Sequence, residues 1–139
     1  MRINFYWIGY ESIPCGILQT EIDTCWVKYA GQDPAAYIRK YTGRSPVVHL
    51  KDFWANNMNA GAAYALIDDA GKEKEADGKK ASGFQFKPLG QGVQDFESIL
   101  EAAEAAGTEF VVVEQDQSPD LPPMESAKIS RQYLKQLGL

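Results

Sequence analysis

Three short apolar runs in the sequence each end in a side chain that can bind a hard divalent metal. The runs cover residues 17–22, 47–48 and 110–113, and they are followed by Asp23, His49 and Glu114. In α/β barrels and open α/β sheets, side chains at the carboxyl ends of successive strands build the active site. Two carboxylates and one imidazole suit Mn²⁺, Mg²⁺ or Co²⁺ better than a metal that prefers thiolates. The sequence therefore predicts a divalent-metal site at one edge of a parallel sheet.

Helix signals separate these strands. Asp33 is a good N-cap and Pro34 suits the first helical position, so a short helix is expected over residues 35–41. After Asp95, apolar residues recur at the spacing of an amphipathic helix that lies on a sheet. A last helix is expected over residues 125–137.

The strand expected over residues 110–113 is apolar at every position. Such a run predicts burial on both faces, which is typical of a parallel strand. Together with the alternation of strands and helices, it predicts an α/β fold with parallel strands in a single domain over residues 1–139.

Two segments fall outside this alternation. Residues 1–18 form an atypical N-terminal segment, and residues 53–94 form a long insertion between a strand and a helix. Inside the insertion, residues 63–67 followed by a turn at 68–71 predict a hairpin. A long segment after the carboxyl end of a strand is either a lid or specificity loop, or a solvated surface excursion.

Composition narrows the classes of partner. The net charge is −5 and no basic stripe is visible, which argues against a nucleic-acid backbone. No apolar stretch reaches the roughly 18 residues of a membrane span, and the first residues lack the features of a signal peptide. Cys15 and Cys25 lack CxxC spacing, so reduced thiols in a cytoplasmic protein are expected. Cys25 is either a reactive thiol near the site or a small buried apolar residue.

Several strings of the sequence resemble the sugar phosphate isomerase/epimerase family with the xylose isomerase-like TIM barrel. They are residues 21–27, 30–34, 43–44, 48–52, 88–96, 112–116 and 130–134. The resemblance runs in order over about residues 19–139. It implies the C-terminal half of the barrel, namely the last three to four βα units of a partial (β/α)₈ TIM barrel.

The resemblance also implies a ligand set. In that family a divalent metal is held by Glu, Asp, His and Glu from the ends of four strands, and Asp23, His49 and Glu114 match the last three. No match to the first Glu is found, since Glu11 is the first acid of the chain and the first sixteen residues contain no His. Each matching residue also has a structural alternative: a helix cap for Asp23, a satisfied core histidine for His49 and an ion-pair partner for Glu114.

The function implied by the resemblance is isomerisation or epimerisation of a sugar or sugar phosphate through an enediolate. The metal polarises a carbonyl, and the carboxylate of Glu114 moves a proton. Trp26, Lys51 and Asp52 are the expected substrate contacts, although Lys51 and Asp52 suit a surface ion pair equally well. The alternatives are a related polyol dehydratase and a half-barrel without catalysis.

Length is the main departure from the family. A complete barrel takes about 250 residues. A partial barrel exposes two strand edges and an apolar inner face, so we expect either a homo-oligomer or a missing N-terminal half.

Overall fold

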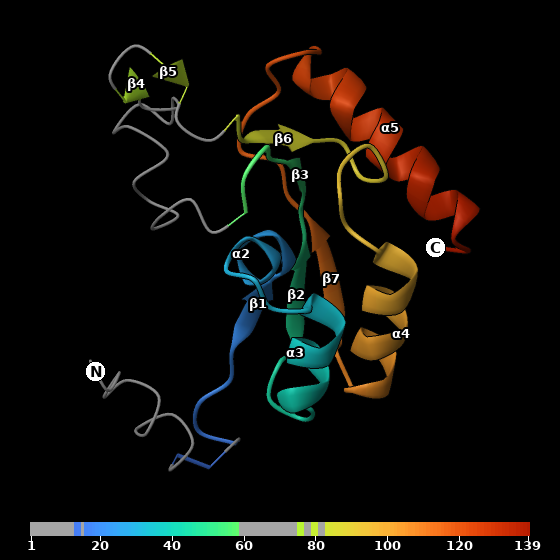
Figure 1. Ribbon diagram of the computed structural model, residues 1–139. Helices are drawn as coiled ribbons and strands as arrows, with labels where there is room; N and C mark the ends of the chain where they lie inside the picture. Colours follow the sequence, from blue (N-terminus) through green and yellow to red (C-terminus); the bar gives the residue numbers. More distant parts are fainter. Residues whose placement is uncertain (1–12, 15, 59–74, 77–78, 81–82) are drawn as a thin grey trace.

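The core of the protein is a parallel sheet of three strands. The computed structural model describes residues 13–14, 16–58, 75–76, 79–80 and 83–139 (Figure 1). The strands are β1 (Glu21–Asp23), β2 (Val47–Leu50) and β7 (Phe110–Val113), in the order β1-β2-β7. Both pairings are parallel, with Asp23 opposite His49 and His49 opposite Val112. The predicted α/β fold with parallel strands is confirmed.

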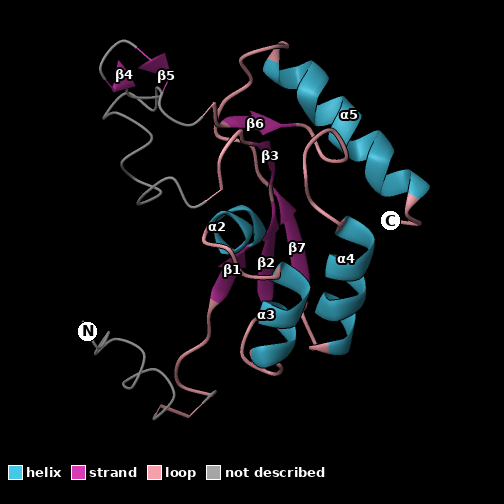
Figure 2. Cartoon of the chain, in the orientation of Figure 1, coloured by secondary structure: helices cyan, strands magenta, loops and turns pink. Residues whose placement is uncertain are grey.

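Helices follow each strand of this sheet. They are α2 (Thr24–Tyr29), α3 (Pro34–Lys40), α4 (Phe96–Ala105) and α5 (Pro123–Gln136), as Figure 2 shows. The predicted helices are confirmed with shifts of one or two residues at their ends, whereas α2 was not predicted. In the part of the chain that the structure describes, no helix is long and apolar enough to cross a bilayer.

Capping explains where α3 and α4 begin. The carboxylate of Asp33 accepts hydrogen bonds from the backbone amides of Ala35 and Ala36, and Pro34 occupies the first turn, where no intrahelical partner is needed. Asp95 accepts from the backbone amide of Ser98 in the same way. The N-caps Asp33 and Asp95 can be recognised in the sequence alone, so the first residues of both helices could be predicted.

The main core lies between the sheet and the pair α3 and α4. Ile22, Val48 and Leu50 share one face of the sheet, and they pack with Ile38 and Phe96 of the helices. All five side chains are almost fully buried. Burying a side chain of this size contributes about 1.5–3 kcal/mol, so this layer fixes the face of the sheet that the helices cover.

The insertion over residues 53–94 has structure at both ends. Strand β3 (Asp52–Trp54) pairs antiparallel with β6 (Gln85–Lys87), and the short strands β4 (Glu75–Ala76) and β5 (Lys79–Lys80) pair with each other. None of these strands was predicted. The hairpin predicted at residues 63–71 lies outside the described residues.

An aromatic cluster joins this small sheet to α2. Phe53, Phe84 and Phe86 pack against Tyr29, and the rings of Phe53 and Phe84 stack with centroids 5.2 Å apart. Cys25 is fully buried in the same cluster, and burial raises the pKa of its thiol well above the usual range. The structure thus favours the small buried apolar residue over the reactive thiol.

Two predictions about the strands are corrected. β1 begins at Glu21 and not at Ile17, whose side chain is 78% exposed. The regular pairing with β2 begins at Glu21 opposite Val47, and one backbone hydrogen bond, from the amide of Thr20 to the carbonyl of Arg44, lies before it. β7 is not buried on both faces: Phe110 is 63% exposed on the face of the sheet that no described helix covers, and β7 is the last strand in the order β1-β2-β7. Its other edge has no partner strand among the described residues.

A buried carboxylate fixes the loop before α4. Asp52 is fully buried and accepts hydrogen bonds from the backbone amides of Phe53, Gly90, Gly92 and Gln94, at 2.9–3.3 Å. A Cβ atom at Gly92 would lie 2.2 Å from the Asp52 carboxylate, so only glycine permits this approach. Burial raises the pKa of Asp52, and the four backbone hydrogen bonds oppose that shift.

We predict that Asp52→Asn lowers the free energy of unfolding by about 1–3 kcal/mol, because its NH₂ group faces backbone amides that need an acceptor. Urea denaturation followed by circular dichroism measures the loss. The matched control is Asp95→Asn at the exposed N-cap of α4, where Asn caps as well as Asp. Equal effects of the two substitutions would contradict the role given to Asp52.

Candidate metal centre

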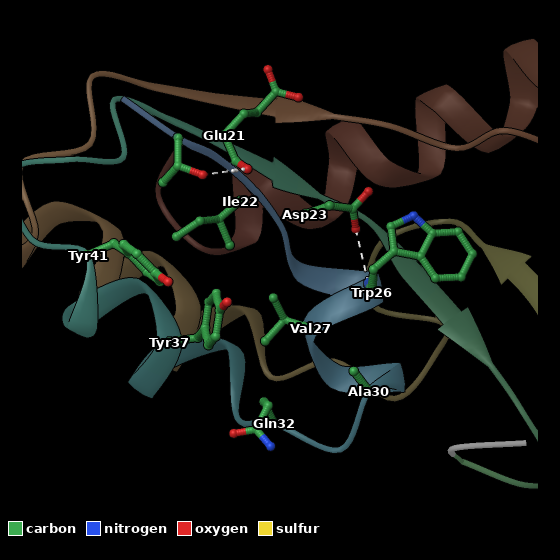
Figure 3. A pocket seen from close by; sticks show the side chains of 10 residues that line it. Glu21, Ile22, Asp23, Trp26, Val27, Ala30, Gln32, Tyr37 and Tyr41 are labelled. Carbon is green, nitrogen blue, oxygen red and sulfur yellow. Dashed lines mark hydrogen bonds between the residues drawn. The ribbon is translucent and has the colours of Figure 1, made fainter. Parts of the chain in front are cut away.

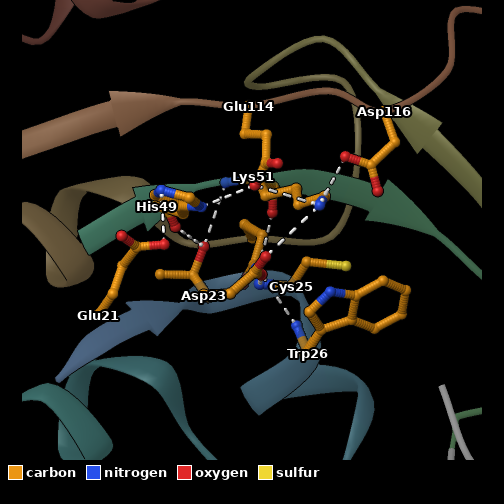
Figure 4. A network of polar contacts seen from close by, with 10 residues as sticks. Glu21, Asp23, Cys25, Trp26, His49, Lys51, Glu114 and Asp116 are labelled. Atoms are coloured by element: carbon orange, nitrogen blue, oxygen red, sulfur yellow. Dashed lines mark hydrogen bonds and ion pairs between the residues drawn. The ribbon is translucent and has the colours of Figure 1, made fainter. Parts of the chain in front are cut away.

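Three potential metal ligands meet at the carboxyl ends of the three parallel strands. Asp23 ends β1, His49 lies near the end of β2, and Glu114 directly follows β7. One ligand atom from each residue lies within 4.8 Å of the others. Figure 4 shows the three side chains turned toward one another. The predicted convergence of these residues is confirmed.

Asp23 uses its two carboxylate oxygens for different tasks. Oδ1 accepts hydrogen bonds from the backbone amides of Cys25 and Trp26, at 2.9 and 3.2 Å, and so caps α2. Oδ2 lies 3.5 Å from the ammonium of Lys51, on the side of the cluster. Burial raises the pKa of Asp23, although the charge of Lys51 opposes the shift. The helix-cap alternative and the ligand prediction are therefore compatible.

His49 lies between two carboxylates. Its Nδ1 is 2.7 Å from Oε2 of Glu114, and its Nε2 is 2.9 Å from Oε1 of Glu21. The backbone is fixed as well, because the hydroxyl of Thr24 donates to the carbonyl of His49 and accepts from the amide of Lys51. The start of α2 is thus tied to the end of β2.

Lys51 supplies a buried positive charge to the cluster. Its side chain is 3% exposed, and Nζ lies 2.8 Å from Asp116, 3.3 Å from Glu114 and 3.5 Å from Asp23. Burial lowers the pKa of Lys51, but the hydrogen bond to Asp116 and the surrounding carboxylates outweigh it and raise that pKa. The ammonium is therefore charged and satisfied by carboxylates of the chain itself.

Aromatic rings flank the ammonium of Lys51. Nζ lies 5.5 Å from the ring centroid of Trp26 and 5.1 Å from that of Phe86, within the range of a cation–π contact. Trp26 also stacks on Phe84, with centroids 5.5 Å apart. The predicted substrate contact Trp26 thus lies beside the cluster, held by other rings.

Asp52 does not share in this cluster. Its carboxylate contacts the backbone amides of the loop before α4, and its full burial leaves no surface for a substrate. We therefore assign Asp52 a structural role in place of the expected substrate contact.

Two residues of the site were not among the predicted ones. Glu21 contacts His49, and Asp116 contacts Lys51. Glu21 has a signal in the sequence, because it stands two residues before Asp23 and so shares its face of the strand. Asp116 also has a signal in the sequence, because it follows Glu114 at the end of β7 as Lys51 follows His49 at the end of β2, although its contact with Lys51 depends on the path of the loop.

The set of donors fits a hard divalent cation. Four carboxylates, those of Glu21, Asp23, Glu114 and Asp116, surround one ammonium and one imidazole. Burial raises the pKa of Glu114, but Lys51 and His49 outweigh this effect and hold that pKa below its usual value. Carboxylate oxygens and imidazole nitrogen are ligands that Mn²⁺, Mg²⁺ and Co²⁺ accept. The remaining negative charge favours a bound cation.

A pocket of about 490 Å³ lies next to these acids, along the edge of β1 (Figure 3). Among the residues that line it are Glu21, Asp23, Trp26, Tyr37 and Tyr41. The volume is within the range of small-molecule pockets. This edge of β1 pairs with no other strand in the described part of the chain, so the pocket also lies where a further strand would pair.

Comparisons with known proteins agree with this geometry. No family model matches the chain. In sequence, it is 31% identical over 116 residues to an inosose dehydratase of Clostridium beijerinckii and 34% identical over 122 residues to one of Geobacillus thermodenitrificans. Each match covers 82% of this chain and 36% of the relative. The chain thus spans about a third of the length of the curated relatives it matches.

The fold is that of solved sugar phosphate isomerases/epimerases. Two such structures from Parabacteroides distasonis superpose on 97% of the chain, with TM-scores of 0.64 and 0.65 and identities of 22% and 17%. The matched part is 38% of the first structure and 36% of the second. The chain is thus similar in sequence to part of the inosose dehydratases, and it has the fold of part of the solved sugar phosphate isomerases/epimerases.

Proposed function

We propose that the chain carries part of the active site of a metal-dependent sugar or sugar phosphate isomerase/epimerase. The observation that supports this most is the meeting of Asp23, His49 and Glu114 at the carboxyl ends of three parallel strands. In barrels of this kind, that edge of the sheet carries the chemistry. The substrate class is a small sugar-like molecule, and Mn²⁺, Mg²⁺ or Co²⁺ is the expected cofactor.

The residues of the cluster have distinct proposed roles. Asp23, His49 and Glu114 would hold the metal, which when bound polarises a substrate carbonyl. Glu114 carries the proton to and from carbon, and its lowered pKa keeps it ionised and ready to accept one. Lys51 holds Glu114 in place, and its buried positive charge stabilises negative charge on a substrate oxygen near the cluster without direct contact. Trp26 forms an apolar wall for the ring of the substrate.

A related polyol dehydratase is the second candidate. It is favoured by the identities of 31% and 34% to inosose dehydratases. Loss of water from a polyol also begins with removal of a proton next to a carbonyl, so the same proton carrier, Glu114, would serve both reactions. A half-barrel that assembles without catalysis is the third candidate.

A cytoplasmic location is also proposed. Cys25 is a free thiol in the structure, and reduced thiols are typical of the cytoplasm.

We expect the chain to bind Mn²⁺, and Asp23→Asn to weaken this binding at least about tenfold. Asn caps a helix as well as Asp does, so α2 is retained while the ligand charge is lost. Isothermal titration calorimetry and the electron paramagnetic resonance of Mn²⁺ measure the affinity. Asp33→Asn makes the same change at the N-cap of α3, away from the cluster, and should leave the affinity unchanged. Equal affinities of the wild type and Asp23→Asn would exclude Asp23 as a ligand.

We expect weak or no turnover by the chain alone, because the family's first Glu has no match here. When catalytic residues act together, loss of one of them removes most of the activity. The measurement is turnover of ketoses, ketose phosphates and an inosose with Mn²⁺ added; isomer formation and loss of water separate the two enzymatic candidates. Robust turnover that disappears in Glu114→Gln would contradict this expectation and show that another acid replaces the first Glu.

Association is proposed because the open side of the sheet is apolar at β7. Phe110 lies opposite Val47, and Val112 lies opposite His49, so both side chains share the face that carries the site. They are 63% and 41% exposed. Covering a few hundred Å² of such surface contributes several kcal/mol, at about 25 cal/mol per Å². The occupant is a second copy of the chain or the N-terminal half of a longer barrel.

Light scattering should therefore give a mass above the 15.4 kDa of the monomer at micromolar concentration, and Phe110→Asp should lower it. Met124→Asp is the matched control, because Met124 is 70% exposed on α5, outside the sheet. A monomeric wild type, or an equal loss of mass in both variants, would contradict association through this face.

A further inference from the structure

We propose that Glu21 is a positioning residue that orients the ring of His49 toward a bound cation. It holds hydrogen on Nε2, so that Nδ1, which faces Glu114, is left with a free electron pair. This inference rests on the proposed metal site and adds to it a residue outside the ligand set.

The strand geometry places Glu21 where this role is possible. Glu21 and Asp23 stand two residues apart on β1, so their side chains leave the same face of the sheet. Asp23 is directly opposite His49 in the parallel register, and Glu21 is opposite Val47, two pairs further back. From that position the Glu21 carboxylate reaches the far nitrogen of the ring, with Oε1 2.9 Å from Nε2 (Figure 4).

The contact between Glu21 and His49 affects which nitrogen of the imidazole carries the hydrogen. A neutral ring carries one N–H, and the acceptor next to it selects which nitrogen holds the hydrogen. Glu21 and Glu114 compete as acceptors, at Nε2 and at Nδ1. Hydrogen on Nδ1 would block the nitrogen that lies beside Glu114, whereas hydrogen on Nε2 leaves it free. In known metal sites, a carboxylate behind a ligating histidine plays this part.

The test compares Mn²⁺ affinity in the wild type, Glu21→Ala and Glu21→Gln, with Glu104→Ala as the control. Glu104 is an exposed acid on α4 away from the cluster, so its variant loses the same charge. Glu21→Ala should bind Mn²⁺ about tenfold to a hundredfold more weakly. Glu21→Gln keeps an acceptor oxygen without charge, so it should recover most of the affinity. An unchanged affinity in Glu21→Ala, or a Gln variant as weak as the Ala variant, would overturn the proposal.

A second readout does not need the metal. His49 is the only histidine of the chain, so the ring region of a ¹H–¹⁵N spectrum reports it alone. In the metal-free protein at alkaline pH, the wild type and Glu21→Gln should show hydrogen on Nε2, and Glu21→Ala should shift it toward Nδ1. The same tautomer in all three proteins would overturn the proposal. A wild type that shows the expected tautomers but binds no Mn²⁺ would instead count against the metal site.

Discussion

The ammonium of Lys51 is the charge on which the acidic edge of the sheet depends. Asp23 at the end of β1 and the acids Glu114 and Asp116 after β7 would repel one another if left alone, and Lys51 lies within 3.5 Å of all three. Its burial makes each of these attractions stronger than on an open surface. Removing one carboxylate partner from a buried ammonium lowers the stability of the fold, because the charge is left without compensation. The same acids form the site, so Lys51 links the stability of the fold to the geometry of the site.

The same arrangement explains how the sheet can be apolar on one face and charged on the other. Period-two alternation along β1 and β2 sends Ile22 and Val48 to the helices and sends Asp23 and His49 to the open face. The hydrogen bonds of Thr24 then hold the ends of the two strands together. The ligands are therefore placed by the pattern that builds the core.

Much of the fold could be predicted because the signals are local. The caps Asp33 and Asp95 set the starts of α3 and α4, and the ends of the strands marked Asp23, His49 and Glu114. Helix α2 was not predicted, although a helix cap was the structural alternative for Asp23, and Asp23 does cap it. The contacts of Glu21 and Asp116 depend on register and on a loop, which no local pattern encodes.

Exposure was harder to predict than secondary structure. The run at β7 has the composition of a strand buried on both faces, yet its surface depends on what lies beside it. Phe110 is exposed because it lies on the face of the sheet that no helix covers in the described residues. An apolar composition predicts that a strand will be buried, but it does not say which segment or partner covers it.

The anchoring of Asp52 has a consequence for how this chain can vary. Asp52 binds the amides of Gly90 and Gly92, so the two ends of the long insertion are joined by one carboxylate next to Lys51. The entropy of closing such a loop grows slowly with its length, by about 0.6 kcal/mol for each doubling. Residues between the anchored ends, outside the aromatic cluster of Phe53, Phe84 and Phe86, can therefore be added or removed at little thermodynamic cost, while Lys51 keeps its position. The insertion is a place where related chains can differ in length without rebuilding the sheet.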